Sequence, residues 1–240
     1  MKKYKYKKIA RNVIDLEIQA LKKLRSSINN SFDQAVDAMV KCQSKIILCG
    51  VGKSYLIASK ISATFSSVGC PSFVIAASDC SHGDLGSISK KDVLILFSNS
   101  GETQELKPVI QYANRNRITL IGIVSKKKSL LYRAADIKLY IPEVNEAGLG
   151  IVPTASTSTQ LAIGDALAVA CLNKKKFSFA KKMIVVVRYR DNDNYTKKIS
   201  SICNARLIWG GDETIKNIRM FKLQQRAIDI AFTDRYSFCA

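Results

Sequence analysis

The chain has 240 residues, of which 47% are hydrophobic and 24% are charged, a composition typical of a globular protein and not of a disordered one. The formal net charge of +19 favours anionic ligands, but the lysines are spread along the chain without a nucleic-acid motif, so we expect no nucleic-acid partner. No apolar run reaches the roughly 18 residues of a membrane span, and no secretory signal follows the basic N-terminus. The seven scattered cysteines form no Cys-x-x-Cys pair, which predicts free thiols in a reducing cytoplasm.

The N-terminal part predicts two helices, and an alternation of strands and helices follows. Apolar residues recur at helical spacing over residues 10–42, with cap residues at Asn29–Ser31 between the two helices. Five short apolar runs then predict strands, at Ile46–Cys49, Phe73–Ala76, Val93–Phe97, Leu120–Val124 and Ile137–Ile141. Helical patterns lie near 54–67, 104–114 and 129–135, and a final helix is predicted from Ser156 to Leu172. The alternation predicts an α/β fold, a three-layer αβα sandwich around a five-stranded parallel sheet.

Two strand–helix turns, in the stretches Ile46–Ser54 and Leu94–Thr103, share one pattern. In each, an apolar run stops at small and hydroxyl residues, and a helix follows. The first turn of a helix leaves backbone N–H groups unpaired beside a positive dipole end, which favours a phosphate. Two such turns can converge where the strand order of an open sheet reverses, so the sequence predicts a phosphate-ester site at that crevice.

Hydroxyl and lysine side chains stand at these turns. Ser98 and Ser100 precede Gly101, and Thr103 is expected one turn into the next helix; three hydroxyls exceed what a cap needs and favour a phosphomonoester. Lys53 can place an ammonium against a phosphate or a developing oxyanion, although a solvated lysine in a tight turn explains it equally well. The spacing of Gly50 and Gly52 is not that of a nucleoside triphosphate loop.

The acidic and histidine candidates stay open on spacing alone. Glu105, expected in the first helical turn, can be a general base or a complement to the helix dipole. Glu146, after the fifth strand, can be a base or a solvated loop residue. His82, the single histidine, can contact a sugar hydroxyl or be structural. We expect no metal and no cofactor.

Four motifs follow one another along the chain: Gly50-Val-Gly-Lys-Ser, Ser81-His-Gly-Asp-Leu-Gly, Ser98-Asn-Ser-Gly-Glu-Thr and Pro153-Thr-Ala-Ser-Thr, the last followed by Gly164-Asp-Ala-Leu-Ala. Together they resemble the motifs of the sugar isomerase (SIS) domain, in particular of the D-arabinose 5-phosphate isomerases, over about residues 8–181. The resemblance implies interconversion of D-arabinose 5-phosphate and D-ribulose 5-phosphate for Kdo in lipopolysaccharide or capsule synthesis, by a homotetramer. It puts the family's catalytic positions at Lys53, Glu105 and Glu146, its phosphate loop at Ser98, Ser100 and Thr103, and its substrate contacts at Gly69, Cys70 and His82, with Ser54 counted among the substrate-binding residues.

The chain departs from that family at three places. Ala76 stands where the family has a metal-binding histidine, and the loop before Pro153 is one residue shorter. The family's His-Pro-Gly-Gly segment, which supplies a catalytic histidine, is replaced where Lys181 runs into Lys182-Met183. We therefore expect isomerase activity lower by about 10²–10⁴-fold than in an intact relative. A non-catalytic phosphosugar-binding or regulatory module is the alternative.

The predicted organisation has three parts: N-terminal helices over 1–42, the SIS domain over 43–181, and a segment over 182–240. Residues 183–240 resemble an internal piece of the long-chain acyl-CoA reductases, through Asn204-Ala-Arg-Leu-Ile-Trp209 and Asp234-Arg-Tyr-Ser-Phe238. So short a segment is expected to be incomplete, to bind no nicotinamide cofactor and to be cut by proteases near 190–195.

Overall fold

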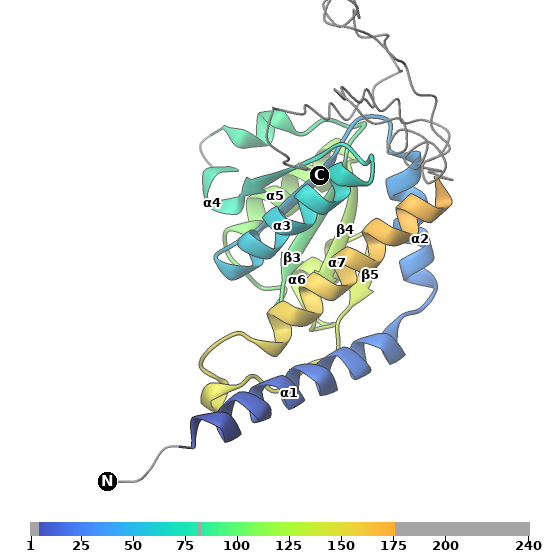
Figure 1. The fold of residues 1–240 in the computed structure, drawn as a ribbon. Coiled ribbons are helices and arrows are strands. Elements are labelled where there is room, and N and C mark those ends of the chain that lie inside the picture. The colour runs from blue at the N-terminus through green and yellow to red at the C-terminus, as the bar shows by residue number, and fades with distance from the viewer. Residues whose placement is uncertain (1–4, 81–82, 176–240) are drawn as a thin grey trace, which may run out of the picture. The chain divides into compact units, whose positions relative to one another are not determined.

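The computed structural model describes residues 5–80 and 83–175, and these form a parallel sheet covered by helices (Figure 1). The chain divides after Lys174 into two units, and the first contains the fold described below. The predicted acyl-CoA-reductase-like segment lies outside the described residues. None of the described helices combines the length and apolarity that crossing a bilayer requires.

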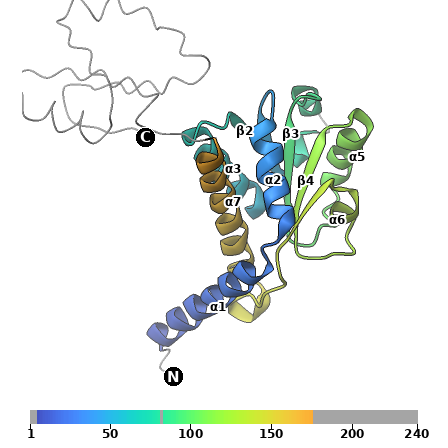
Figure 2. The same cartoon turned by 90° about the vertical axis from the view of Figure 1, so that its right-hand side faces the viewer.

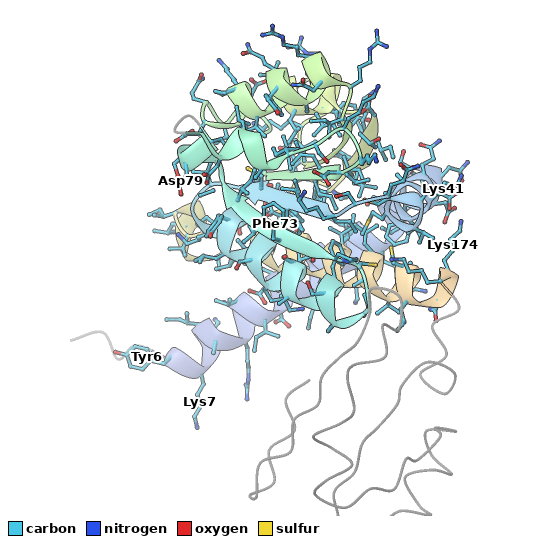
Figure 3. The ribbon with its side chains drawn as sticks, turned by 90° about the horizontal axis from the view of Figure 1, so that it is seen from above. Tyr6, Lys7, Lys41, Phe73, Asp79 and Lys174 are labelled. Atoms are coloured by element: carbon cyan, nitrogen blue, oxygen red, sulfur yellow. The ribbon has the colours of Figure 1, made fainter. Side chains whose placement is uncertain are left out.

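Two helices precede the sheet, as predicted. Helix α1 spans Tyr6–Ser27 and α2 spans Asn30–Lys41. The Asn29 side chain caps α2 by accepting a hydrogen bond from the Ser31 amide at 2.9 Å. Helix α1 packs on the last helix, α7, whereas α2 contacts both α7 and the last strand. Figure 3 shows Tyr6 and Lys7 at the end of α1 that projects away from the sheet.

All five predicted strands are present, and each predicted bound lies within one residue of the observed one. They are β1 (Ile46–Gly50), β2 (Ser72–Ala76), β3 (Val93–Ser98), β4 (Thr119–Val124) and β5 (Ile137–Tyr140). All neighbours are parallel, in the order β2-β1-β3-β4-β5. The chain therefore moves outward from β1 to β2 and then returns across β1 to β3, so the strand order reverses between β1 and β3.

Helices cover both faces of the sheet, which confirms the three-layer αβα architecture (Figure 2). One layer holds α2, α3 (Lys53–Ser67) and α7 (Ala155–Lys174); the other holds α4 (Ala77–Cys80), α5 (Leu106–Asn116) and α6 (Leu130–Ala134). Along β3, Ile95 joins the first core, whereas Leu94 and Leu96 join the second. Because both faces of the sheet centre are buried, β1 and β3 are almost entirely apolar, whereas the edge strands β2 and β5 are mostly half-buried and β5 contains Lys138. The short α4 and the 3-10 turns η1 (Asp84–Ser87) and η2 (Gly148–Gly150) were not predicted.

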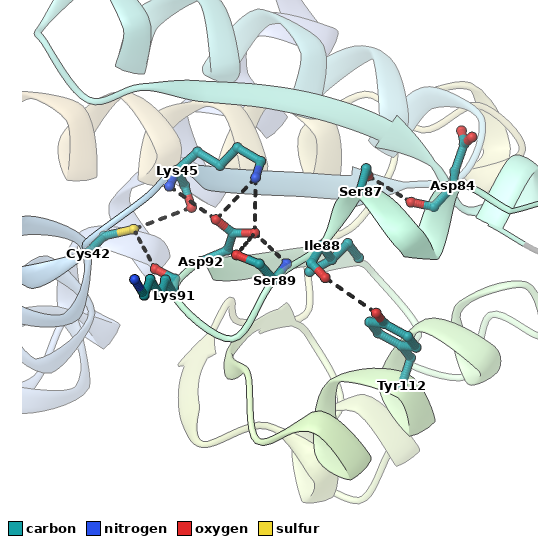
Figure 4. A network of polar contacts seen from close by, with 9 residues as sticks. All are labelled: Cys42, Lys45, Asp84, Ser87, Ile88, Ser89, Lys91, Asp92 and Tyr112. Carbon is teal, nitrogen blue, oxygen red and sulfur yellow. Dashed lines mark hydrogen bonds and ion pairs between the residues drawn. The ribbon is translucent and has the colours of Figure 1, made fainter. Parts of the chain in front are cut away.

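A buried carboxylate fixes the amino end of the sheet (Figure 4). Asp92 is 2% exposed and accepts hydrogen bonds from the Ser89 amide at 2.6 Å and the Ser89 hydroxyl at 3.0 Å. It also accepts from the Lys45 amide at 3.2 Å and pairs with the Lys45 ammonium at 3.3 Å. Lys45 and Asp92 immediately precede β1 and β3, so this network ties the starts of the two central strands together.

Candidate functional site

The fold brings the two predicted turns to the same edge of the sheet. Strands β1 and β3 are parallel neighbours, with Cys49 opposite Leu96, so the loops that follow them leave the sheet side by side. The strand order reverses at this point, and in open α/β sheets such a crevice at the carboxyl ends of the strands is where ligands bind.

The loop after β3 is a turn held by hydrogen bonds of its own hydroxyl groups. Ser98 is 2% exposed, and its hydroxyl accepts the Gly101 amide at 2.9 Å and shares a 2.8 Å hydrogen bond with the Thr103 hydroxyl. The Ser100 hydroxyl accepts the Glu102 amide at 3.2 Å. Because one hydroxyl of the Ser98–Thr103 pair donates to the other, the second hydroxyl hydrogen can donate to an anion.

Two expected positions at the start of α5 need correction. The helix begins at Leu106, so Thr103 lies in the turn before it and not one turn inside. The turn is closed by hydrogen bonds from the Leu106 amide to the Thr103 carbonyl and from the Lys107 amide to the Gln104 carbonyl. Glu105 is the N-cap residue, with an exposed side chain that makes no capping hydrogen bond. Its carboxylate therefore stays accessible at the helix start.

The loop after β3 is fastened to the loop after β4, which sequence reasoning did not detect. Gly101 has φ +67°, and a Cβ there would lie 2.2 Å from the Ser129 hydroxyl oxygen. The Ser125 hydroxyl donates to the Asn99 side chain at 2.6 Å, and the Leu130 amide donates to Glu102 at 2.8 Å. In the sequence, Gly101 follows β3, and Ser125 and Ser129 follow β4. Only the pairing of β3 with β4 shows that these residues contact one another.

On the other side of the crevice, Lys53 is exposed as the first residue of α3. The turn before it is tight, because a Cβ on Gly50 would lie 2.9 Å from the backbone of Ser54. The Ser54 hydroxyl donates to the buried Gln160 side chain of α7 at 3.2 Å, so Ser54 joins α3 to α7.

Glu146 is a half-buried cap of α7, which corrects the interpretation of a solvated loop residue. Its carboxylate accepts the Thr154 amide at 2.7 Å, the Thr154 hydroxyl at 3.2 Å and the Ser156 amide at 3.3 Å. Burial alone would raise the pKa of Glu146, but the hydrogen bonds from Ser156 and Thr154 outweigh it and lower the pKa below its ordinary value. Glu146 is therefore ionised at neutral pH and has its acceptor sites engaged.

Two of the residues that resemblance assigned to the substrate lie elsewhere in this fold. Gly69 and the fully buried Cys70 follow the end of α3 and precede β2, at the amino edge of the sheet, opposite to the crevice. His82 lies outside the described residues. Within the described part of the chain, no group of three His, Cys, Asp or Glu side chains is placed to hold a metal ion.

Known proteins share both the sequence and the fold. The family model described as SIS domain matches residues 39–170. An arabinose 5-phosphate isomerase KdsD from Yersinia pestis is 40% identical over 72% of this chain and 53% of its own length, so the chain spans about half of that relative. A KdsD from Shigella flexneri is 34% identical over 96% of this chain and 75% of its own length.

A solved structure gives the same result. The Escherichia coli CFT073 protein c3406, solved in complex with arabinose 5-phosphate, superposes with a TM-score of 0.70 at 35% identity, covering 74% of this chain and 95% of that one. The fold of that protein and the fold of this chain therefore agree, at a sequence identity of 35% that indicates common ancestry. Since the family model matches more than half of the chain and relatives above 30% identity match 72% and 96% of it, the chain belongs to the SIS domain family.

Proposed function

We propose that this protein binds a sugar 5-phosphate in the crevice between β1 and β3 and interconverts D-arabinose 5-phosphate and D-ribulose 5-phosphate. The observation that supports the proposal is the hydroxyl pair of buried Ser98 and half-buried Thr103, held in a preformed turn at the point where the strand order reverses. The KdsD names of the relatives and the arabinose 5-phosphate complex of the E. coli neighbour support the same substrate. The product would enter Kdo synthesis for lipopolysaccharide or capsule.

The charged residues around the crevice can divide the work of an aldose–ketose isomerisation. A proton moves between C1 and C2 through an enediolate, which needs a base and a stabilising positive charge. Lys53, exposed at the start of α3, supplies the positive charge. Glu105 is the better candidate for the base, because its carboxylate is free of capping bonds, whereas the carboxylate of Glu146 is engaged by α7. Glu146 then positions the start of α7 beside the site.

A coupled assay of ribulose 5-phosphate isomerisation tests the proposal. We expect slow turnover by this chain, and a rise of about 10²–10⁴-fold when the residues after Lys181 are replaced by the family's His-Pro-Gly-Gly continuation. Glu105→Gln should abolish turnover in the improved chain without weakening the binding of arabinose 5-phosphate. If this chain turns over as fast as its intact relatives, the predicted loss at Lys181 is wrong.

The alternative is a non-catalytic phosphosugar-binding or regulatory module, which the missing histidine segment favours. It predicts binding of arabinose 5-phosphate by calorimetry with no turnover in either chain. We also propose a reducing cytoplasmic location for either function, because the seven cysteines are scattered without a Cys-x-x-Cys pair and Cys49, Cys70 and Cys171 are buried.

We also propose that the protein is a homo-oligomer, a tetramer by resemblance. Helix α1 carries an exposed apolar stripe at i, i+4 and i+7, formed by Ile14, Ile18 and Leu21, which are 56%, 44% and 39% exposed. Such a stripe on a helix that packs on the fold by another face is typical of an association surface.

A further inference from the structure

A run of three lysines, Lys126–Lys128, lies beside the proposed phosphate loop. Val124, the last residue of β4, pairs in register with Ser98, the last residue of β3, from which that loop continues. Neighbouring strands are about 4.8 Å apart, and Lys126 follows Val124 by two residues, at most about 7 Å of chain. The backbone of the lysine run therefore starts within about 12 Å of Ser98.

The backbone of this lysine turn is fixed relative to the phosphate loop. Its far end is closed by Ser129, whose amide and hydroxyl donate to the Lys126 carbonyl at 3.1 and 2.6 Å. Its near end is joined to the phosphate loop by the Ser125–Asn99 hydrogen bond, and Gly101 packs directly against Ser129. The position of the lysines is thus set by the same contacts that shape the phosphate loop.

Within residues 5–80 and 83–175, two of the three ammonium groups have no ionic or aromatic partner. Lys127 lies over the ring of Tyr140, with its ammonium 4.6 Å from the ring centroid, and so turns towards β5. Lys126 and Lys128 are exposed, and no carboxylate in the described part of the chain forms an ion pair with either.

The phosphate loop itself needs compensating positive charge. It carries two exposed carboxylates, Glu102 and Glu105, which repel a phosphate dianion. Lys53 stands on the β1 side of the crevice, and the lysine turn stands on the β4 side. Lysines are common on protein surfaces and usually need no explanation. This lysine turn, however, lies beside the loop proposed to bind a phosphate, where its positive charge offsets the repulsion by Glu102 and Glu105.

We propose that Lys126 and Lys128 are substrate-binding residues that attract the phosphate dianion of the substrate electrostatically and take no part in the chemical step. This inference rests on the proposed function and adds the residues that bring the substrate in. It predicts that their removal raises KM and weakens phosphate binding while kcat is unchanged. It also predicts that the effect disappears in high salt, because the Debye length falls from about 30 Å at 0.01 M to about 3 Å at 1 M.

The test compares two double variants of equal charge in the full chain. Lys126→Gln/Lys128→Gln removes the proposed substrate-binding lysines, and Lys90→Gln/Lys91→Gln removes two exposed lysines at the amino edge of the sheet, immediately before the Asp92 network. Titration calorimetry with arabinose 5-phosphate and with inorganic phosphate, and isomerase kinetics, are measured at about 0.01 M and about 1 M ionic strength. The control separates a local effect from the general field of a chain with net charge +19.

We expect the first variant to bind arabinose 5-phosphate and inorganic phosphate about 3- to 10-fold more weakly in low salt, to match the wild type in high salt, and to keep its kcat. The control variant Lys90→Gln/Lys91→Gln should weaken the binding of both ligands less than the first variant does. Equal losses in both variants, or a lower kcat in the first, would overturn the inference. If the wild type binds phosphate but never isomerises ribulose 5-phosphate, the proposed activity fails, while the phosphate titrations still decide the role of the lysines. If the wild type binds neither ligand, both proposals fail.

Discussion

At the residue scale, Gly101 and Gly148 allow a controlled comparison, because they share a backbone conformation but differ in their surroundings. Both have left-handed backbone, with φ of +67° and +61°, but a Cβ on Gly101 would overlap Ser129, whereas one on Gly148 would meet nothing within 4 Å. Gly148→Ala should therefore lower the free energy of unfolding by only about 1 kcal/mol of backbone strain. Gly101→Ala should cost a further 1–3 kcal/mol, roughly the penalty of overpacking, and should also weaken the binding of arabinose 5-phosphate. Urea unfolding and calorimetry measure the two effects; equal behaviour of the two variants would show that the two loops are not locked together.

The Asp92 network predicts a pH-dependent stability. Burial raises the pKa of Asp92, but hydrogen bonds from Ser89, Ser44 and Lys45 lower it further than burial raises it, so its folded pKa lies below the unfolded one. A depressed carboxylate pKa stabilises the fold above the unfolded value of about 3.9 and loses that contribution as pH falls through the folded value. Asp92→Asn should lower the free energy of unfolding by about 1–3 kcal/mol at pH 7, and the difference from wild type should shrink below about pH 4. Glu143→Gln, an exposed carboxylate, is the control and should show neither effect.

At the element scale, helix α7 begins on the carboxylate of Glu146, so that residue has a structural role besides any catalytic one. Glu146→Gln keeps the shape but removes the charge that accepts the Thr154 and Ser156 amides. We expect a loss of about 0.5–2 kcal/mol in the free energy of unfolding, as for a helix cap. Glu105→Gln should lose activity without that loss of stability, because its side chain makes no cap. Thermal unfolding of both variants separates the roles, and equal stability of Glu146→Gln and wild type would remove the capping role.

The elements that the sequence predicted are those whose signal is local. The central strands β1 and β3 are buried apolar runs, and the edge strands β2 and β5 are runs of mainly apolar residues, so each could be located from its own sequence. The hydroxyl cluster at Ser98–Thr103 lies directly at the end of β3. The Asp92–Lys45 pair is separated by 47 positions, and Ser125 meets Asn99 across 26, so neither contact leaves a periodic pattern. The cap at Glu146 was missed because the carboxylate reaches its helix across the eight residues to Thr154, well beyond the three of an ordinary capping box.

At the scale of the whole molecule, the crevice and the lysine turn lie at the carboxyl edge of the sheet. Helix α5, which follows the phosphate loop, belongs to the layer that holds α4 to α6. Helix α1 packs on α7 on the other face and carries none of the predicted site residues. Its buried residues, Ala20 and Leu24, face α7, and the stripe at Ile14, Ile18 and Leu21 lies on a different face of the same helix. Lys53 begins α3 and Glu146 caps α7, so the proposed site also uses the layer on which α1 packs. The exposed stripe of α1 itself carries no predicted site residue, so it can be changed without replacing one.

The predicted self-association follows from that stripe. Ile14→Glu/Ile18→Glu places two charges on the exposed apolar face of α1 and should dissociate the oligomer to a species of 26.6 kDa in light scattering at micromolar concentration. Asn12→Glu/Gln19→Glu adds the same two charges to the same helix, but at about 100° per residue these positions fall well away from Ile14 and Ile18, so this variant should stay oligomeric. Circular dichroism checks that both variants keep their helices. A monomeric wild type, or an equal effect of the two variants, would show that the α1 stripe does not hold protomers together.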